Sequence, residues 1–277
     1  GAAQNLPNIA RFSTTTPGPM VGVIGGGTDA PVTSLVVVGG QYFLSGLFTS
    51  AYDFDCQGLI AYDEPKQQYV SVGQPLLDNT TLTLNDPPST ILMTHSFLLG
   101  GLKYIIAAGR FRSIGQVPFY SLAFQSYDPA TVPSTAWQPF PGGGPRHDLK
   151  EYASNLFLHD LGTVNVVLEV NGILYLGGDF TWAGGIAATN LVRYSMANQT
   201  WIPWVASVDG PVYSIIRRGD EILVGGDFVT INNITVNHIA RWDLLKGTWL
   251  AAGLGFPNMV TSLAVVRTTV WATGPFS

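Results

Sequence analysis

Apolar residues in this chain occur in short runs that end at turns rich in glycine and asparagine. Helical spacing of apolar residues is hard to find along the sequence. The stretch from 212 to 252 illustrates the pattern, because its four apolar runs are separated by a Gly-Asp turn, a polar loop and a Lys-Gly turn. We predict these runs as strands: Val212–Arg217, Glu221–Phe228, His238–Leu244 and Thr248–Ala252. The pattern therefore predicts an all-β chain of four-stranded units.

A Gly-x-Phe tripeptide closes the second strand of each unit and occurs five times. Successive copies are 63, 69, 48 and 48 residues apart, and the distance from the last copy to the first, counted across the chain ends, is 49. Repeats of roughly 40–50 residues with four strands each are typical of β-propellers. We therefore predict a five-bladed β-propeller in which five phenylalanines are buried anchors between blades: Phe48, Phe111, Phe180, Phe228 and Phe276.

The last unit is divided between the two ends of the chain. In two complete units the third strand lies in Asn190–Tyr194 and Asn237–Asp243, whereas the last unit stops one residue after its Phe. A matching stretch, Asn8–Phe12, lies near the N-terminus. We predict one propeller domain over residues 1–277, whose last blade joins strands from both ends and leaves no open sheet edge. These strands are expected at about Ile9–Gly25 and Val260–Phe276.

Composition and charge narrow the classes of partner. Hydrophobic residues make up 46% of the chain and charged residues 11%, which suits buried sheet faces with short polar loops and excludes a disordered tail. The net charge is −5 and the 13 lysines and arginines are scattered, so nucleic acid is not an expected partner. The longest apolar stretch, Ile91–Ala108, contains His95, Lys103 and a Gly-Gly pair, which predicts a hairpin rather than a membrane span.

Candidate catalytic and metal-ligating residues are few. Asp179 and Asp227 could act as the paired carboxylates of a glycosidase, yet both occupy the x position of Gly-x-Phe, which favours a structural role. We therefore predict no enzyme activity and keep the five-bladed propeller glycosidase as an alternative. Neither the histidines nor the single Cys56 has the spacing of a zinc site, and Cys56 is expected to be a buried thiol. No cofactor or metal is predicted.

Two insertions distinguish the long repeats and point to one face of the propeller. They lie at about 73–88 and 139–163, between the fourth strand of one unit and the first strand of the next. In an up-and-down blade, that connection shares a face with the loop between the second and third strands. Functional groups of propellers usually lie in such loops, so we predict a binding face here. Its candidate residues are Tyr52, Asp53, Asp55, Phe119, Tyr120, Trp182, Arg146, His147, Asp148 and Tyr152. Of these, Tyr52, Phe119, Tyr120 and Trp182 could equally fold inward as loop core.

Three Asn-x-Ser/Thr sequons favour an extracellular location slightly. They are potential glycosylation sites at Asn79, Asn198 and Asn233. On the predicted binding face, a glycan at Asn233 would shield one sector.

Gly-Gly-Asp-Phe at 177–180 and 225–228, the Asn-(x)-Ile-Ala-Arg-aromatic stretches, and Trp201 and Trp249 together carry a family resemblance. The repeats resemble the kelch-like units of the fungal Rax-family cortical polarity markers, which are large bud-site-selection membrane proteins. The resemblance implies an ectodomain portion of a membrane-anchored, cell-surface glycoprotein with a role in polarity or adhesion.

We accordingly predict a non-enzymatic extracellular scaffold that binds another protein. A lectin that resembles the tachylectins is the alternative, in which a glycan is the partner. Such a lectin would show equivalent aromatic and amide residues in every blade, whereas the loops here differ from blade to blade.

Overall fold

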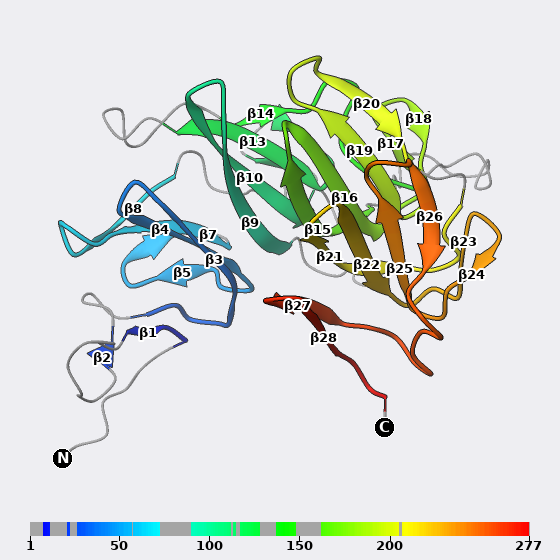
Figure 1. Cartoon of the computed structure of the whole chain (residues 1–277). Helices are drawn as coiled ribbons and strands as arrows, with labels where there is room; N and C mark the ends of the chain where they lie inside the picture. Colours follow the sequence, from blue (N-terminus) through cyan, green and yellow to red (C-terminus); the bar gives the residue numbers. More distant parts are fainter. Residues whose placement is uncertain are drawn as a thin grey trace, which may run out of the picture. The chain divides into compact units, whose positions relative to one another are not determined.

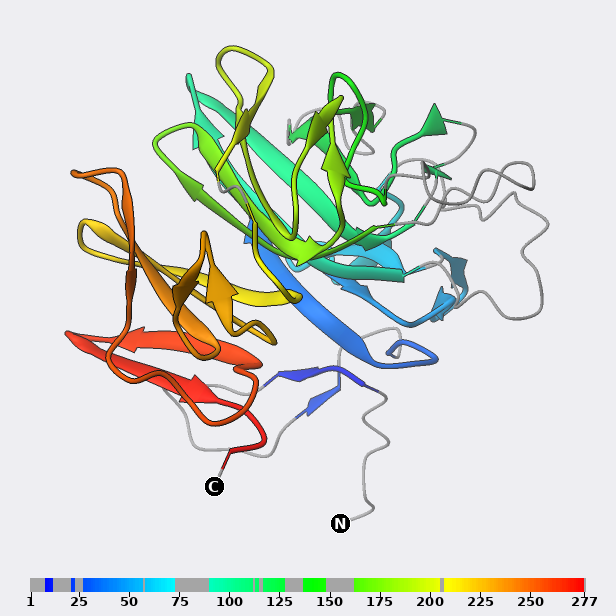
Figure 2. The same cartoon turned by 90° about the vertical axis from the view of Figure 1, so that its right-hand side faces the viewer.

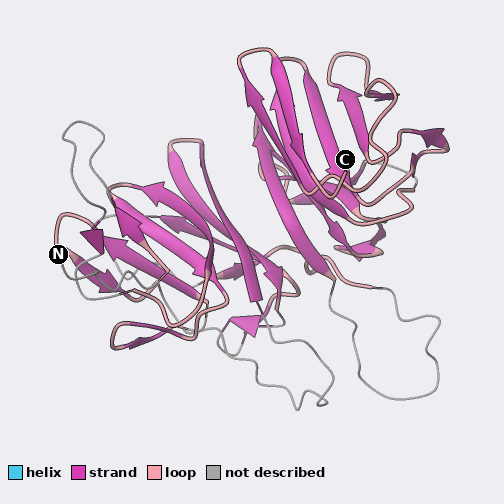
Figure 3. Cartoon of the chain, turned by 90° about the horizontal axis from the view of Figure 1, so that it is seen from below, coloured by secondary structure: helices cyan, strands magenta, loops and turns pink. Residues whose placement is uncertain are grey.

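The structure is a computed structural model of the chain. It describes residues 8–11, 21–22, 27–56, 58–72, 90–111, 113–114, 117–127, 137–147, 162–204 and 207–276. Every regular element in these ranges is a β-strand (Figures 1 and 3), so they hold no helix that could cross a membrane. The chain divides into two compact units. The first comprises Gly1–Phe119 and Ala123–Pro139, and the second comprises Tyr120–Leu122 and Phe140–Ser277.

Two four-stranded antiparallel sheets lie in the first part of the chain. One has the order β3 (Val32–Val38), β4 (Gln41–Gly46), β7 (Leu59–Asp63) and β8 (Gln68–Val70). The other has the order β9 (Thr90–Leu99), β10 (Leu102–Arg110), β13 (Leu122–Tyr127) and β14 (Gln138–Pro139). Three short pairs accompany them: β1 (Ala10–Arg11) with β2 (Val21–Gly22), β5 (Ser50–Ala51) with β6 (Phe54–Asp55), and β11 (Ser113–Ile114) with β12 (Val117–Pro118).

The second unit repeats this arrangement. Its first sheet has the order β15 (Thr163–Val170), β16 (Ile173–Asp179), β19 (Leu191–Ser195) and β20 (Thr200–Pro203). Its second sheet has the order β21 (Val212–Arg218), β22 (Glu221–Gly226), β25 (Ile239–Asp243) and β26 (Thr248–Ala251). The short pairs are β17 (Trp182–Ala183) with β18 (Ile186–Ala187), β23 (Thr230–Ile231) with β24 (Ile234–Thr235), and β27 (Ser262–Val266) with β28 (Thr269–Thr273). Figure 2 shows β27 and β28 beside the sheet of β21 and β22.

The predicted all-β, four-stranded units are therefore confirmed. In the unit at 212–252, the observed strands agree with the predicted ones to within two residues at each end.

The glycine of Gly-x-Phe has a packing reason. In the β3–β4, β15–β16 and β21–β22 pairs, the register shifts at a β-bulge near this glycine. A Cβ atom on Gly178 would lie 1.9 Å from the carbonyl oxygen of Thr163, and one on Gly226 would lie 2.2 Å from that of Pro211. Because no side chain fits at that distance, the bulge requires glycine.

The phenylalanine of the motif is buried in four of the five copies. Phe48, Phe111, Phe180 and Phe228 are at most 1% exposed, whereas Phe276 is only partly buried and stacks on Phe256 with ring centroids 4.6 Å apart. Within the second unit, the cluster around Phe228 joins both four-stranded sheets. It includes Val170, Tyr175, Val212, Ile222 and Val224. The predicted burial of the anchors is confirmed for four copies.

The chain ends form two separate strand pairs in the described residues. β1 pairs with β2 through Ala10↔Gly22 and Arg11↔Val21, and β27 pairs with β28. A fifth blade assembled from both ends, the count of five and the single domain over 1–277 stay predictions.

Candidate functional site

The loop after the second strand of each four-stranded sheet folds into a small hairpin. These hairpins are β5–β6, β11–β12, β17–β18 and β23–β24, where the sequence predicted only loops. In three of them the two tip residues are described, and the first tip residue is left-handed in each case, with φ of 51° at Tyr52, 55° at Gly184 and 48° at Asn232. Each hairpin is a separate two-stranded sheet within a loop that the sequence analysis assigned to the predicted binding face.

Two aspartates that were not among the predicted site residues hold the β5–β6 and β23–β24 hairpins in place. The carboxylate of Asp29 accepts hydrogen bonds from the Thr49 and Ser50 amides, both at 2.9 Å, and from the Thr49 hydroxyl at 2.6 Å. Asp209 accepts the same set from Val229 and Thr230 at 2.8–2.9 Å. An Asp-x-Pro-Val motif, 17 residues before the glycine of Gly-x-Phe in both repeats, is the signal that could have found them.

The hydrogen bonds to these aspartates also set their acidity. Burial acts to raise the pKa of Asp29, but the hydrogen bonds from Thr49 and Ser50 outweigh it and hold the pKa below its usual value. The pKa of Asp209 is lowered in the same way, against burial, by hydrogen bonds from Thr230 and Val229. Both carboxylates therefore stay ionised as structural clamps at neutral pH.

Asparagine side chains fix loops to a connecting segment at two points, and one of them is Asn190, directly before the third strand β19. The Asn190 amide donates to the carbonyls of Gly210 at 2.9 Å and Val208 at 3.3 Å. Asn8 donates in the same way to Thr28 at 2.6 Å, and both asparagines are left-handed. The loop between second and third strands thus lies at the same end as the connection between sheets, as the topology argument predicted.

Four predicted site residues meet in the second unit. Arg146 and Trp182 form an antiparallel bridge through two N–H···O=C bonds of 2.8 Å. The Arg146 guanidinium lies over the Tyr120 ring, 5.6 Å from its centroid, and His147 Nε2 is 3.8 Å from Asp179 Oδ1. We call Tyr120, Arg146, His147, Asp179 and Trp182 the Arg146 patch. An insertion residue and a hairpin residue are thus fixed beside each other by backbone hydrogen bonds.

The aspartate pair considered for glycosidase chemistry lies next to imidazoles. His147 contacts Asp179, and His238 Nδ1 lies 3.8 Å from Asp227 Oδ1. Burial raises the pKa of Tyr213, and the charges of Asp227 and Asp179 raise it further, so both carboxylates lie near this phenol. Within the described ranges, no three His, Cys, Asp or Glu residues gather as a metal site. The two Asp–His pairs therefore place charged and hydrogen-bonding groups at the ends of the second strands.

The remaining predicted site residues differ in exposure: some are exposed, one is buried, and two lie outside the described residues. Tyr52 is 61% exposed at the tip of β5–β6, and Asp53 and Asp55 are exposed beside it. Phe119 is a correction, because it is 1% exposed within the apolar cluster around Phe111 and cannot contact a partner. An apolar loop residue that reaches the core gains more from burial than from exposure. Two further predicted residues, Asp148 and Tyr152, lie outside the described residues.

Two of the three predicted glycosylation sites are exposed in the described part of the chain, and the cysteine is buried. Asn198 is exposed in the turn between β19 and β20, and Asn233 is exposed at the tip of β23–β24, while Asn79 lies outside the described residues. Cys56 is a buried free thiol. Its burial, and secondarily the charges of Asp29 and Asp55, raise the pKa of the thiol to about 12, which makes it unreactive.

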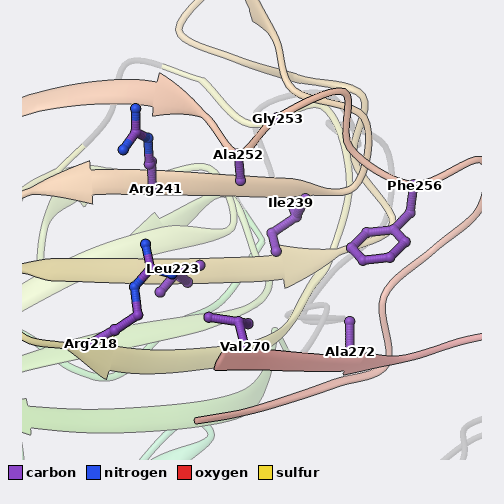
Figure 4. Close-up of a pocket in the computed structure, with 9 residues that line it drawn as sticks. All are labelled: Arg218, Leu223, Ile239, Arg241, Ala252, Gly253, Phe256, Val270 and Ala272. Atoms are coloured by element: carbon purple, nitrogen blue, oxygen red, sulfur yellow. The ribbon is translucent and has the colours of Figure 1, made fainter. Parts of the chain in front are cut away.

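A pocket of about 450 Å³ lies away from the Arg146 patch, between the sheet of β22, β25 and β26 and strand β28 (Figure 4). Glu221 accepts hydrogen bonds from both Arg218 at 2.5 Å and Arg241 at 2.8 Å. In the preceding sheet, Trp204 directly follows β20 and packs on Tyr175 with ring centroids 4.7 Å apart. The corresponding residue directly after β26 is the much smaller Ala252. The pocket lining contains none of the predicted site residues: Arg218, Leu223, Ile239, Arg241, Ala252, Gly253, Phe256, Val270 and Ala272.

Comparisons with known proteins agree with this architecture. A family model described as the Rax2 C-terminal beta propeller domain matches residues 152–275. Two crystal structures of the extracellular domain of BT4673 from B. thetaiotaomicron, described as a hybrid two-component system and as a one-component system, are similar in fold. Their TM-scores are 0.51 and 0.52 at 14% identity, over 88% and 90% of this chain. The chain spans 26% and 27% of those structures.

No curated protein matches the chain. The repeated four-stranded sheets, the family-model match and the structural likeness together define a β-propeller domain that is similar to the Rax2 propeller.

Proposed function

We propose that this propeller is a non-enzymatic scaffold at the cell surface that binds another protein through its loop face. The chain would be an ectodomain portion of a larger membrane-anchored glycoprotein with kelch-like repeats and a role in cell polarity or adhesion. The similarity to the Rax2 propeller domain supports this cell-surface location, and the exposed sequons Asn198 and Asn233 are compatible with it.

The Arg146 patch is the observation that carries the proposal. Tyr, Trp and Arg are the residue types that dominate binding energy at protein interfaces. Here Arg146 and Trp182 are locked together by backbone hydrogen bonds, and Tyr120 is held under the guanidinium. A preorganised patch loses little conformational freedom when a partner docks, so more of the contact energy appears as affinity.

The test is capture of a partner from cell-surface extracts, with the whole chain as bait and chemical cross-linking to locate the contact. We expect cross-links at the loop face, and we expect Arg146→Ala and Trp182→Ala each to reduce capture at least tenfold. Asn198→Gln, in an exposed turn between strands, is the matched control and should leave capture unchanged. Capture that is insensitive to both patch variants would overturn the proposal.

Two further measurements separate the alternatives. A glycan array with the same variants tests the lectin, for which binding of one sugar class, rather than protein, is the expected result. Turnover of chromogenic glycosides that is lost in Asp179→Asn and Asp227→Asn would instead establish a glycosidase.

We also propose that the propeller has five blades and that the two chain ends complete the fifth. The β1–β2 pair starts at the position of a third strand, because Asn8 has the left-handed φ and the amide contact of Asn190. The β27–β28 pair resembles β21–β22, the first and second strands of their sheet, because in both pairs the second strand leads into a Gly-x-Phe motif. In this proposal, each pair would supply the half of a blade that the other lacks.

A further inference from the structure

The tip of the β5–β6 hairpin differs from its sister hairpins in a way that costs backbone energy. In the two sister hairpins whose tips are described, the first tip residue is Gly184 or Asn232, the two residue types that tolerate a left-handed backbone best. At the same position this hairpin has Tyr52, with φ of 51°. A tyrosine in this region is uncommon and is disfavoured by its Cβ atom. An outlier of this kind is a reason to look for a function.

The side chain that carries this cost does not contribute to a core. Tyr52 is 61% exposed, and Phe54, two residues further on, is 39% exposed. The hairpin beneath them is firmly anchored, because Ala51 is fully buried and the Tyr52 amide donates to the Gly27 carbonyl at 3.1 Å. The Asp29 carboxylate clamps its first strand through the Ser50 amide. The hairpin therefore presents two aromatic side chains on a rigid support.

The two charged residues of this hairpin tip are both acidic. Asp53 lies between them in the sequence and Asp55 follows, and both are exposed. The chain as a whole carries a net charge of −5. A cationic side chain gains from nearby carboxylates and from the face of an aromatic ring.

We infer that the tip Tyr52–Asp55 is a docking site for a basic segment of a protein, one that carries Lys or Arg next to an apolar side chain. The inference rests on the proposed function and names the chemistry of the partner at this hairpin. Tyr52 would be the anchor residue, retained in a strained conformation because the contact needs it. The two carboxylates would select basic over acidic segments and speed their association.

The decisive variant is Tyr52→Asn, which places the residue of the sister tip at this position. Because asparagine tolerates the left-handed backbone, we expect the melting temperature to rise by a few degrees. Binding to an array of short peptides graded in net charge should select basic peptides that contain an apolar residue, and Tyr52→Asn should weaken this binding at least tenfold. Added salt should weaken it as well.

Matched variants separate anchoring from folding. Asn232→Tyr makes the reverse exchange in the β23–β24 hairpin and should lower the melting temperature without affecting peptide binding. The double variant Asp53→Asn with Asp55→Asn should remove the preference for basic peptides while the melting temperature is retained.

Three outcomes would overturn the inference: a lower melting temperature in Tyr52→Asn, unchanged peptide binding in that variant, or equal binding of acidic and basic peptides. Selection of sugars on the glycan array at this tip would do the same. If a protein is captured through the Arg146 patch while the peptide array shows no charge preference, the proposed function stands and only this inference fails.

Discussion

At the scale of single residues, the clamping aspartates link the loop face to pH. A carboxyl group whose pKa is lower in the folded than in the unfolded chain stabilises the fold above its unfolded pKa, and this contribution is lost as the pH falls through the folded pKa. The pKa values of Asp29 and Asp209 are both lowered. The fold should therefore lose stability below about pH 4.

The variant Asp209→Asn tests this linkage. It should be less stable at pH 7 by about 1 kcal/mol, because a hydrogen bond to a neutral amide oxygen is weaker than one to a carboxylate. Urea unfolding between neutral and acidic pH should show the difference from the parent chain shrinking as the carboxylate is protonated. Asp29→Asn should behave alike in the other hairpin, and parallel pH profiles for variant and parent would contradict the role.

The buried phenylalanines of the repeat give a second prediction at this scale. Phe180 is fully buried, so Phe180→Ala should cost about 3–5 kcal/mol of unfolding free energy. For Phe276, which is partly buried against Phe256, an open ring predicts a smaller loss, whereas the closed ring that we propose predicts a similar one. Denaturant titration of the two variants measures both values, and equal losses would show that Phe276 is as covered as the others.

At the scale of the elements, the β17–β18 hairpin depends on one of its two tip glycines. A Cβ on Gly184 would lie 1.7 Å from Cδ1 of Trp201, whose indole N–H donates to the Pro141 carbonyl at 2.8 Å. A Cβ on Gly185 would meet nothing within 4 Å, although this residue also has a positive φ. The two substitutions therefore separate backbone strain from collision.

We expect Gly185→Ala to cost about 1 kcal/mol, which is the price of a left-handed alanine. Gly184→Ala should lower the unfolding free energy by clearly more. It should also loosen the Arg146 patch, because the Gly184 amide donates to the carbonyl of Gly143, which lies in the same insertion as Arg146. Urea unfolding gives the energies, and hydrogen exchange at the Trp182 amide reports on the patch. Similar exchange in both variants would show that the hairpin tip does not support the patch.

The elements also show what the sequence could predict. The strands from 212 to 252 were predictable because apolar runs and turn residues are local signals. The hairpins of the loops were not, since each strand has two residues, too short for any periodicity. Asp209 clamps Thr230 from 21 positions away, and although the repeated Asp-x-Pro-Val motif marks the aspartate, it does not show which residue the aspartate binds. Phe119 was misplaced because an aromatic loop residue packs inward or outward according to its neighbours.

At the scale of the whole molecule, the last strand pair carries an exposed tryptophan where the other repeats have a buried residue. Trp271 is 63% exposed, whereas Phe43, Tyr175 and Leu223, each three residues before the glycine of Gly-x-Phe, are 2–5% exposed. Those residues are buried by the sheet that follows theirs in the chain. In the closed five-bladed ring that we propose, the first blade would follow the last and cover Trp271 in the same way.

The variant Trp271→Ala distinguishes a closed from an open ring in solution. Closure predicts a loss of about 3–5 kcal/mol of unfolding free energy, the usual cost of truncating a buried aromatic residue. An open arrangement predicts a change within about 0.5 kcal/mol, as for other surface substitutions. Leu254→Ala, at a side chain that is 94% exposed, is the matched control and should change little in either case.

Acrylamide quenching of tryptophan fluorescence is an independent measurement of ring closure. The emission that Trp271→Phe removes is the emission of Trp271, and this indole should be protected from acrylamide if the ring is closed. A neutral Trp271→Ala together with an accessible indole would contradict closure while leaving the four-stranded sheets and the Arg146 patch as they are.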